Sequence, residues 1–438
     1  MNKFEKLLLT VFFVELFVGG GGRLIDFGFL SIRQVLFIGL MLTFLYRIMS
    51  QKAIRNLEVN TFFRLNPVTI GIYLLLCWFG ISAIIGYLNG NALSDIVTDF
   101  LRVSFIAAYF PLAYYISEGR FQKQRIITLL KYSAFAVAVF TILIALLGKT
   151  VFSDNFQPYK LFLLSIMGDD LLFRPSYSVF YKSHFYVFVG LVLSLNAVLT
   201  KKFSKVDILN LILCPISIFW SETRGFLFAL MVSLLMIMIV DIIIMTTPIK
   251  GLSGKIKAVM QNSQLIKKLI ILLAITVSVP ILYQYMTLER FEKSSAAQGV
   301  TGEINDTSAS VRVEYVLYSK DLLLDHPQYL VWGKGYGTEI AGRVTGIETS
   351  FLDILVEQGG IGLAIWFFLF LLVYTNYYRG FKRGMILQTA DISFLGIFMG
   401  VLLLTNINPF INNPIGIVFF LIVLILSRNT LEQSNNLK

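Results

Sequence analysis

About twelve long apolar runs, separated by polar connections, constrain the fold of this chain more than any other feature of its sequence. Roughly 20 consecutive apolar residues cross the hydrocarbon core of a bilayer, and they do so as a helix because lipid offers no partners for open backbone. The runs lie near residues 5–20, 27–48, 68–88, 100–117, 126–147, 177–199, 207–221, 225–245, 269–286, 350–376, 389–405 and 415–428. We therefore predict an all-α integral membrane protein, with one polytopic domain over residues 1–438 and about twelve transmembrane helices.

The charge of the chain agrees with a membrane protein and argues against a nucleic-acid-binding one. Only 14% of the residues are charged, whereas 56% are hydrophobic, and soluble proteins carry roughly 25% charged residues. The net charge of +11 could indicate binding to nucleic acid. The lysines and arginines instead lie in short clusters between the apolar runs, which is the topology signal of a protein embedded in the bilayer. We expect no nucleic-acid partner.

Every second connection is basic, and this alternation predicts which side of the membrane each connection faces. The basic clusters are Lys3 and Lys6; Lys52, Arg55 and Arg64; Arg120, Lys123, Arg125 and Lys131; Lys201, Lys202 and Lys205; Lys250, Lys255, Lys257, Lys267 and Lys268; and Arg379, Lys382 and Arg383. Cytoplasmic connections carry an excess of Lys and Arg. An even number of spans with both termini in the cytoplasm therefore satisfies every connection at once.

Residues 287–349, between the ninth and tenth runs, form a long polar segment on the predicted outer side. Apolar residues recur there at helical spacing with charged residues between them: Val313, Val316, Leu317, Leu323 and Leu324, with Lys320, Asp321 and Asp325. This pattern predicts an amphipathic helix that lies on the membrane or caps the bundle. His326 and Pro327 are expected to end the helix.

Two arginines on the predicted outer side could bind an anion. Arg224 stands in a short connection, residues 220–225, at or just beneath the outer membrane boundary. It is either a boundary arginine paired with Glu222 or an anion clamp, because a guanidinium group stays charged and its planar fork matches phosphate oxygens. Arg312 opens the amphipathic segment, where it could also be a solvated surface charge.

Further cationic groups occur on the same side of the predicted topology. Arg174 precedes Pro175, and Lys182 and His184 stand at the entrance of the sixth run. Together with the two arginines they would surround an outward-facing cavity with positive charge. The spacing does not show whether these side chains converge.

Glu348 is the candidate proton acceptor of the external segment. It is followed by Thr349 and Ser350 at the start of the tenth run, where a carboxylate is favoured by the free N–H groups of a helix terminus. A capping role and a catalytic role are both open and are compatible. Asp353 and Glu357 follow on the same helix, and either one could pair with an arginine.

Several other features of the sequence carry less specific signals. The segment Gly333–Lys–Gly–Tyr–Gly337 lacks the strand and the Gly-Lys-Ser/Thr of a P-loop, so we expect close backbone packing, with its amide groups left available to an anion. Gly19–Gly22 is expected to be a flexible outer turn. The two cysteines lie inside apolar runs, and the two histidines have no Cys or His cluster around them, so no metal site is expected.

Four motifs, taken together, resemble the O-antigen ligase and polymerase superfamily. Ser221-Glu-Thr-Arg-Gly225 resembles the Ser-x-Thr-Arg-Gly signature of that family, and Arg312 with Asp325-His-Pro327 and Gly333–Gly337 resembles its outer loop. Glu348-Thr-Ser-Phe-Leu352 with Glu357-Gln-Gly-Gly-Ile-Gly362 is similar to the family's His-Asn-x-x-Leu and Glu-x-Gly-x-x-Gly helix. The turn with Asn406-Ile-Asn-Pro409 and Asn412-Asn-Pro414 also fits. Ligases place histidine where Glu348 stands, so the chain looks more like the polymerase branch.

The resemblance implies a metal-independent, GT-C-like glycosyltransferase without a cofactor, in the bacterial inner membrane with its active site toward the periplasm. Such polymerases join oligosaccharide repeat units linked to undecaprenyl diphosphate, with inversion at the anomeric carbon, into O-antigen or other surface polysaccharide chains. The role of the ligase histidine would pass to the Glu348 carboxylate or to no base at all, and our hypothesis places Arg224 and Arg312 on the diphosphate and Glu348 as base. Arg174, Lys182 and Tyr336 would line the donor or acceptor site. Partners would be lipid-linked glycans, the bilayer and a chain-length regulator protein.

Two alternatives remain open from the sequence. A ligase of the same superfamily would transfer finished polymer to a lipid A-core or another acceptor. A transporter or flippase for polysaccharides or small anions would also contain about twelve helices, although transporters usually show internal repeats and charges at the membrane midplane.

Overall fold

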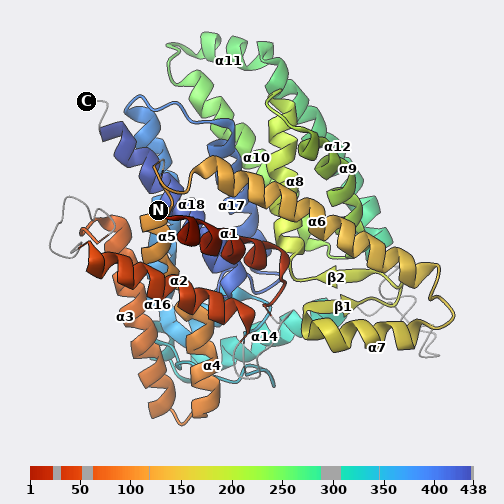
Figure 1. Cartoon of the computed structure of the whole chain (residues 1–438), viewed down its shortest axis with the longest axis vertical. Helices are drawn as coiled ribbons and strands as arrows, with labels where there is room; N and C mark the ends of the chain where they lie inside the picture. Colours follow the sequence, from red (N-terminus) through yellow and green to blue (C-terminus); the bar gives the residue numbers. More distant parts are fainter. Residues whose placement is uncertain (23–30, 52–62, 118, 288–306, 345, 436–438) are drawn as a thin grey trace. The chain divides into compact units, whose positions relative to one another are not determined.

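The computed structural model describes the whole chain except residues 23–30, 52–62, 118, 288–306, 345 and 436–438. Most of the described residues are helical (Figure 1), and the predicted all-α class is confirmed. The described strands are β1 (Leu171–Phe173) and β2 (Val179–Tyr181), which pair antiparallel. The chain forms two compact units, and each is considered by itself.

Unit 1 comprises Met1–Gly39, Gln122–Asp306 and Leu387–Gly400. Its elements are α1 (Lys3–Val18), the first part of α2 (Ile32–Ser50), α6 (Lys123–Lys149), α7 (Phe156–Met167), η2 (Gly168–Asp170), β1, β2, α8 (His184–Leu199), α9 (Lys205–Trp220), α10 (Gly225–Thr246), α11 (Leu252–Gln261), α12 (Ser263–Thr287) and most of α17 (Thr389–Leu404). The core lies where α6, α8 and α9 pack against one another. A Cβ on Gly190 of α8 would lie 2.2 Å from the Cβ of Ala134, so glycine permits this close helix contact.

Unit 2 comprises Leu40–Phe121, Thr307–Ile386 and Val401–Lys438. Its elements are the end of α2, α3 (Pro67–Leu88), α4 (Leu93–Ser104), η1 (Phe105–Ala108), α5 (Tyr109–Tyr115), α14 (Thr307–Asp325), α15 (Tyr329–Trp332), α16 (Ser350–Lys382), the end of α17 and α18 (Pro414–Asn435). Helix α16 packs against α3, α15 and α18. In the most apolar stretch of α18, 83% of the residues are buried, so this helix forms the centre of the unit.

Local sequence signals explain where two helices of unit 2 begin and bend. Asn66 caps α3 because its side chain accepts hydrogen bonds from the N–H groups of Val68 and Thr69, and Pro67 occupies the first turn. In α16 the backbone leaves helical geometry at Gly359, where φ is 68° and ψ is −176°. Glycine tolerates this conformation. The bend separates a short first segment, which carries Asp353 and Glu357, from the longer apolar segment.

Each of the twelve predicted apolar runs overlaps a helix, but the structure supports a smaller set of clear membrane spans. Among the described residues, eight helices are long and apolar enough to cross a membrane, and α8 and α17 are shorter apolar helices. The runs at 5–20 and 207–221 correspond to α1 and α9, of 16 residues each. The count of twelve therefore stays a prediction. Residues 27–30 of the second run and 288–306 of the external segment lie outside the described residues.

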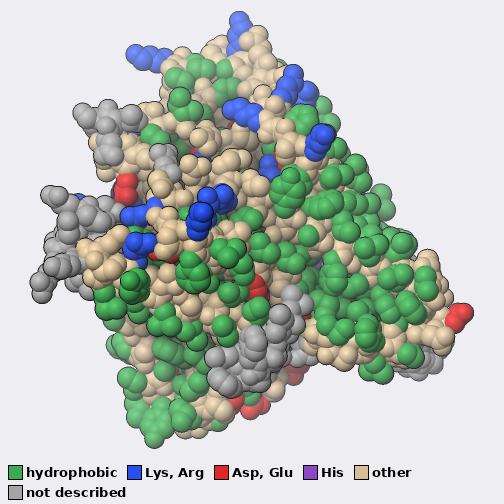
Figure 2. All heavy atoms as spheres, viewed as in Figure 1, with side chains coloured by type: hydrophobic (Ala, Val, Ile, Leu, Met, Phe, Trp, Pro, Cys, Tyr) green, Lys and Arg blue, Asp and Glu red, His purple; other side chains and the backbone are tan. Residues whose placement is uncertain are grey.

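Basic and apolar side chains separate on the surface of unit 1. Figure 2 shows lysine and arginine side chains gathered at the α11 end of this unit and hydrophobic side chains along α9 and α12. This separation is what the positive-inside rule requires of a polytopic bundle. Lys52 and Arg55 of the second basic cluster lie outside the described residues. The side of the membrane that each end faces stays a prediction.

A helix is present in the external segment as predicted: it is α14, which ends at Asp325 before His326 and Pro327. That this helix lies on the membrane stays a prediction, and part of it packs into a hydrophobic cluster of unit 2. The residues buried in this hydrophobic cluster are Tyr315, Leu323, Ile340, Ile347 and Val356. Most of the predicted stripe is at least half exposed, namely Val313, Val316, Leu317 and Leu324. Apolar residues occur on more than one side of this helix, so spacing alone does not select the side that packs.

Replacing Gly86 of α3 with alanine is expected to destabilise unit 2. The new Cβ would lie 2.3 Å from the carbonyl oxygen of Tyr336 and 3.0 Å from its amide nitrogen, so backbone must move. Overpacking of this kind costs about 1–3 kcal/mol, which thermal unfolding in detergent would measure as a lower Tm. Gly80→Ala in the same helix is the matched control, because nothing lies within 4 Å of its Cβ position. Equal stability of the two variants would contradict the close contact.

Candidate active site

Arg312 and Glu348 form an ion pair in unit 2. Arg312 lies in the first half of α14, and Glu348 stands two residues before the start of α16. Arg312 Nη2 lies 2.7 Å from Glu348 Oε2, and the two side chains are 26% and 33% exposed. Arg312 Nη2 also donates a hydrogen bond to the carbonyl oxygen of Ile407 at 3.1 Å. The arrangement places a carboxylate and a guanidinium group side by side at a partly open surface.

Polar atoms around this pair keep hydrogen-bonding capacity. Within the described part of the chain, Arg312 Nε, Thr349 Oγ1 and Asn408 Nδ2 have no hydrogen-bond partner, and Glu348 Oε2 has its ion pair with Arg312. Buried polar groups are normally paired, so a group of unpaired ones is a place where a polar ligand gains free energy by binding. The set contains both donors and acceptors, as recognition of a sugar hydroxyl and an anion would require.

The turn between α17 and α18 is attached to the start of α16, and this attachment holds Ile407 and Asn408 near Glu348. Ser350 Oγ donates to Asn412 Oδ1 at 2.9 Å, and Thr405 Oγ1 donates to Ser350 Oγ at 2.9 Å. The backbone N–H of Ser350 donates to the carbonyl oxygen of Thr405 at 3.0 Å. The asparagine-rich turn singled out in the sequence therefore belongs to the same locality as Glu348.

Arg174 and Arg224 lie on either side of one turn in unit 1. Arg174 Nε donates to the carbonyl oxygen of Ser221 at 3.4 Å. Arg224 is the N-cap residue of α10, donates from Nη1 to Tyr283 Oη at 3.0 Å and lies over the Tyr283 ring at 4.7 Å. Glu222, the alternative partner considered for Arg224, accepts a hydrogen bond from Ser176 Oγ. Arg174 therefore contacts the turn at residues 221–224, and Arg224 is the last residue of that turn.

Lys182 and His184 are less available than the sequence indicated. Lys182 Nζ forms an ion pair with Asp170 Oδ1 at 2.8 Å, and its side chain is 39% exposed. His184 is fully buried, and its Nε2 lies 3.0 Å from Ser217 Oγ. His184 is therefore part of the core of unit 1, and the expectation that it adds an outer cationic group is wrong.

The glycine segment near α1 is fastened to the hairpin rather than free. Asp170 Oδ2 accepts a hydrogen bond from the N–H of Gly21 at 2.6 Å, and Ser183 Oγ accepts one from the N–H of Gly20 at 2.9 Å. Tyr181 Oη donates to the carbonyl oxygen of Val18 at 2.6 Å. The expected flexible turn at Gly19–Gly22 is thus held by the segment that carries Lys182.

The loop Gly333–Gly337 uses its own amide groups, so the expectation that they remain available to an anion is wrong. The N–H of Lys334 donates to Val356 O at 2.7 Å, that of Gly335 to Glu357 O at 3.1 Å, and that of Tyr336 to Ser82 O at 3.1 Å. The N–H of Gly337 donates to Asp99 Oδ2 at 3.0 Å. The predicted close backbone packing is confirmed.

Tyr336, predicted to line the donor or acceptor site, is fully buried. Its hydroxyl group has no hydrogen-bond partner among the described residues. Burial raises the pKa of the Tyr336 phenol well above its ordinary value, so the hydroxyl group stays protonated. In this geometry Tyr336 supports the loop from within unit 2.

Asp99 and Arg102 of α4 were missed from the sequence. Arg102 Nη2 lies 3.1 Å from Asp99 Oδ1, 3.3 Å from Asp353 Oδ2 and 3.4 Å from Glu357 Oε2. Asp353 and Glu357 do pair with an arginine, as considered, but that arginine is on α4. The available signal was Arg102, an ionisable residue inside the predicted span 100–117, because such residues are costly in a membrane and usually functional.

The described residues contain no group of three or more His, Cys, Asp or Glu side chains arranged to hold a metal ion. The expectation that neither a metal nor a cofactor takes part stays a prediction.

A comparison with curated proteins finds a full-length relative. The chain is 26% identical over 445 residues to the O-antigen polymerase of Shigella flexneri, and the match covers 100% of this chain and 99% of that protein. The chain resembles an O-antigen polymerase from end to end. The resemblance predicted from the motifs is confirmed. No protein-family model matches the chain.

The six predicted site residues divide between the two units. Arg174, Lys182 and Arg224 belong to unit 1, whereas Arg312, Tyr336 and Glu348 belong to unit 2. Within unit 1, Arg174 and Arg224 meet at one turn, and within unit 2, Arg312 and Glu348 meet directly. The roles of all six residues stay predictions.

Proposed function

We propose that this protein is a glycosyltransferase of the O-antigen polymerase type, which joins lipid-linked oligosaccharide repeat units into surface polysaccharide. One observation carries the proposal: the Arg312–Glu348 pair, with its unpaired polar atoms, lies on motif residues of a chain similar over its whole length to an O-antigen polymerase. We propose undecaprenyl diphosphate as the carrier lipid, the bacterial inner membrane as the location, and a chain-length regulator as a protein partner.

The chemistry proposed for the pair is a single displacement at the anomeric carbon. The acceptor hydroxyl oxygen attacks this carbon and forms the new glycosidic bond, while the bond to the diphosphate oxygen breaks. The leaving diphosphate takes the electron pair, and the hydroxyl proton passes to the Glu348 carboxylate. A direct displacement of this kind inverts the anomeric centre.

Each partner of the pair supplies what one half of this step needs. Glu348 is 33% exposed beside Arg312, so a substrate hydroxyl can reach its carboxylate and pass a proton to it. Arg312 supplies a fixed cation beside it, and a preorganised cation stabilises the charge that develops on a leaving diphosphate. Arg224 and Arg174 are proposed as further ligands for phosphate or sugar oxygens, because guanidinium groups bind such oxygens through a planar fork.

The test is polymer formation by the purified protein in lipid nanodiscs supplied with undecaprenyl-diphosphate-linked repeat units. A ladder of products that differ by one repeat unit is the expected result. Transfer of preformed polymer to a lipid A-core acceptor, without growth of single units, would support a ligase instead. Movement of intact lipid-linked units across vesicles, without any new glycosidic bond, would overturn the enzyme assignment in favour of a transporter.

A further inference from the structure

A buried cluster in unit 2 contains one guanidinium group and three carboxyl groups. It consists of Arg102 and Asp99 from α4 with Asp353 and Glu357 from the first segment of α16. The side chain of Arg102 is 11% exposed, and those of the three carboxylates are at most 2% exposed. One guanidinium group thus faces three carboxyl groups, and removal of that cation would leave a buried carboxylate without its partner, which is strongly unfavourable.

The cluster holds the loop that leads to Glu348 at both of the loop's ends. Asp99 Oδ2 accepts a hydrogen bond from the N–H of Gly337 at 3.0 Å, and Asp353 Oδ1 accepts one from the N–H of Ile347 at 3.4 Å. The loop backbone also contacts the guanidinium group itself, since a Cβ on Gly346 would lie 2.0 Å from Arg102 Nη1. The last of these loop contacts are one and two residues from Glu348.

The same cluster reaches the other side of the Arg312–Glu348 pair. Asp353 Oδ2 accepts a hydrogen bond from Asn412 Nδ2 at 2.5 Å. Asn412 belongs to the turn whose Ile407 carbonyl accepts from Arg312. The carboxylate paired with Arg102 is therefore linked both to the residue before Glu348 and to the turn that holds Arg312.

We propose that Arg102 is a positioning residue, which sets Glu348 against Arg312 by neutralising the carboxylates that hold the loop and the turn. This inference rests on the proposed function for its catalytic consequence, although its structural consequence does not. A lysine at this position keeps the positive charge but lacks the planar fork that reaches several carboxylates. Arg102→Lys should therefore fold while holding the loop less precisely.

The test compares Arg102→Lys with Arg428→Lys in nanodiscs. Arg428 is the matched control, because it is also buried in unit 2 and paired, with Glu432 Oε1 at 2.7 Å and Tyr109 Oη at 2.8 Å. Hydrogen exchange of the amides of residues 335–344 and 346–348 should accelerate at least tenfold in Arg102→Lys and stay unchanged in Arg428→Lys. In the ladder assay, kcat should fall at least tenfold in Arg102→Lys with KM within twofold of the unmodified protein.

Each outcome bears on a separate claim. Unchanged loop exchange in folded Arg102→Lys would overturn the positioning role, whether or not polymer forms. Faster loop exchange with an unchanged kcat would show that the position of the loop does not control catalysis, and would overturn the proposed effect of Arg102 on the rate. If the unmodified protein makes no polymer, the proposed function fails, and the exchange comparison still decides the structural claim. Should Arg102→Lys not fold, the double variant with Glu357→Gln, which needs one buried carboxyl group less to be paired, takes its place in both measurements.

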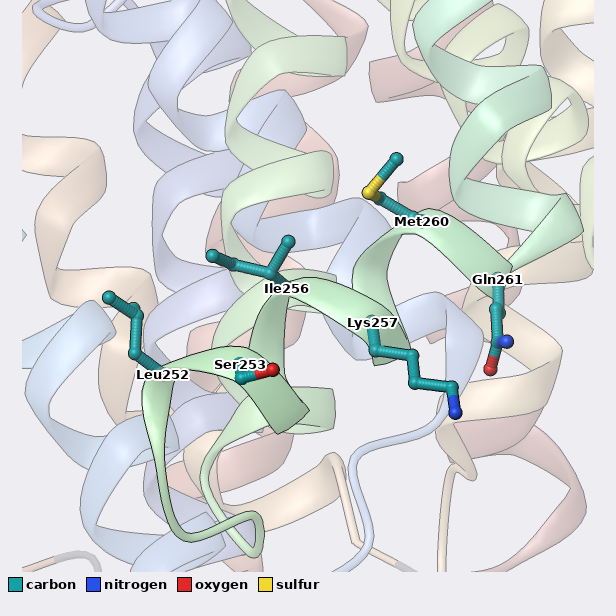
Figure 3. A pocket seen from close by; sticks show the side chains of 6 residues that line it. All are labelled: Leu252, Ser253, Ile256, Lys257, Met260 and Gln261. Atoms are coloured by element: carbon teal, nitrogen blue, oxygen red, sulfur yellow. The ribbon is translucent and has the colours of Figure 1, made fainter.

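A different observation, in unit 1, points to a lipid-binding surface. Helix α11 follows α10 and precedes α12 in the sequence, and both of these neighbours are long and apolar. None of the residues of α11 is buried. Leu252, Ile256 and Met260 follow one another at helical spacing on one side (Figure 3), and they are 75%, 50% and 70% exposed. The sequence contains no Asp or Glu from 242 to 287 but contains the lysines Lys250, Lys255, Lys257, Lys267 and Lys268.

We propose that α11 lies in the headgroup region of the bilayer and binds anionic phospholipid. Its apolar side chains would contact the acyl boundary, and Lys250, Lys255, Lys257 and Lys267 would contact phosphate groups, as in basic amphipathic helices at membrane surfaces. Lys268 is buried and forms an ion pair with Asp241 at 2.5 Å, so it is not one of them. Charge complementarity selects this occupant, because four lysines in a stretch of sequence without Asp or Glu favour a negatively charged surface.

The test places an environment-sensitive fluorophore on Met260→Cys, in a background with Cys77→Ser, in nanodiscs of phosphatidylcholine with or without phosphatidylglycerol. We expect a blue shift of the emission that is larger with phosphatidylglycerol, and loss of that difference in Lys255→Gln/Lys257→Gln. Lys201→Gln/Lys202→Gln, from another basic connection of unit 1, is the control and should retain it. An equal shift in both lipids would overturn the anionic preference. A blue shift seen only in native membranes, and in neither type of nanodisc, would overturn the proposed lipid contact in favour of a protein partner.

Discussion

Replacing Glu348 with glutamine is expected to lower the rate of glycan polymerisation by about 10²–10⁴-fold, the usual contribution of a positioned general base. Glutamine keeps the size of the side chain and can still accept a hydrogen bond, but it cannot take the proton of the acceptor hydroxyl. It also removes the negative partner of Arg312, which lies 2.7 Å away. The measurement is the initial rate of ladder formation by purified protein at saturating lipid-linked substrate.

Glu314→Gln is the matched control for this prediction. Glu314 is an exposed carboxylate on α14, two residues after Arg312, so its neutralisation changes the charge of the same segment without touching the pair. We expect it to retain the rate of the unmodified protein. A Glu348→Gln protein that polymerises at the rate of Glu314→Gln would exclude Glu348 as the base.

Replacing Arg224 with alanine is expected to lower kcat/KM by about 10²–10³-fold, the range found when one preorganised donor to a developing anion is removed. Arg224 is fixed at the N-terminus of α10 by its contacts with Tyr283, so little reorganisation would be needed when it meets phosphate oxygens. Arg224→Lys should recover part of the loss, because it restores the charge but not the two-pronged geometry. Rates measured across a range of lipid-linked substrate concentrations give this ratio.

Lys160→Ala separates a specific role of Arg224 from a general effect of outer positive charge. Lys160 lies on α7, between the predicted apolar runs 126–147 and 177–199 as Arg174 does, and it takes no part in the proposed chemistry. Its removal should leave kcat/KM within about twofold. Equal losses in Lys160→Ala and Arg224→Ala would reduce Arg224 to one of several interchangeable charges and contradict the assignment.

The residues around Glu348 illustrate which parts of a site local sequence can indicate. Glu348, Arg312 and the asparagine-rich turn were each recognised from short motifs, and unit 2 brings all three together. Motifs succeed here because side chains that touch a substrate are restricted in type and spacing. Tyr336 stood in such a motif as well, yet it is buried, because the same motif also packs the loop against α3 and α16.

The sequence by itself determined the helical membrane class, the apolar segments and most of the candidate site residues. Hydrophobicity and chemical type are properties of individual residues and short windows, and the bilayer imposes helix formation wherever enough apolar residues follow one another. Only the tertiary structure decided that Tyr315 packs α14 together with Leu323, that the amides of Gly333–Gly337 are occupied, and that Arg102 faces three carboxyl groups. Arg102 is 251 residues from Asp353 and 255 from Glu357. Such contacts depend on which helices pack together, and a local pattern carries no information about its distant partner.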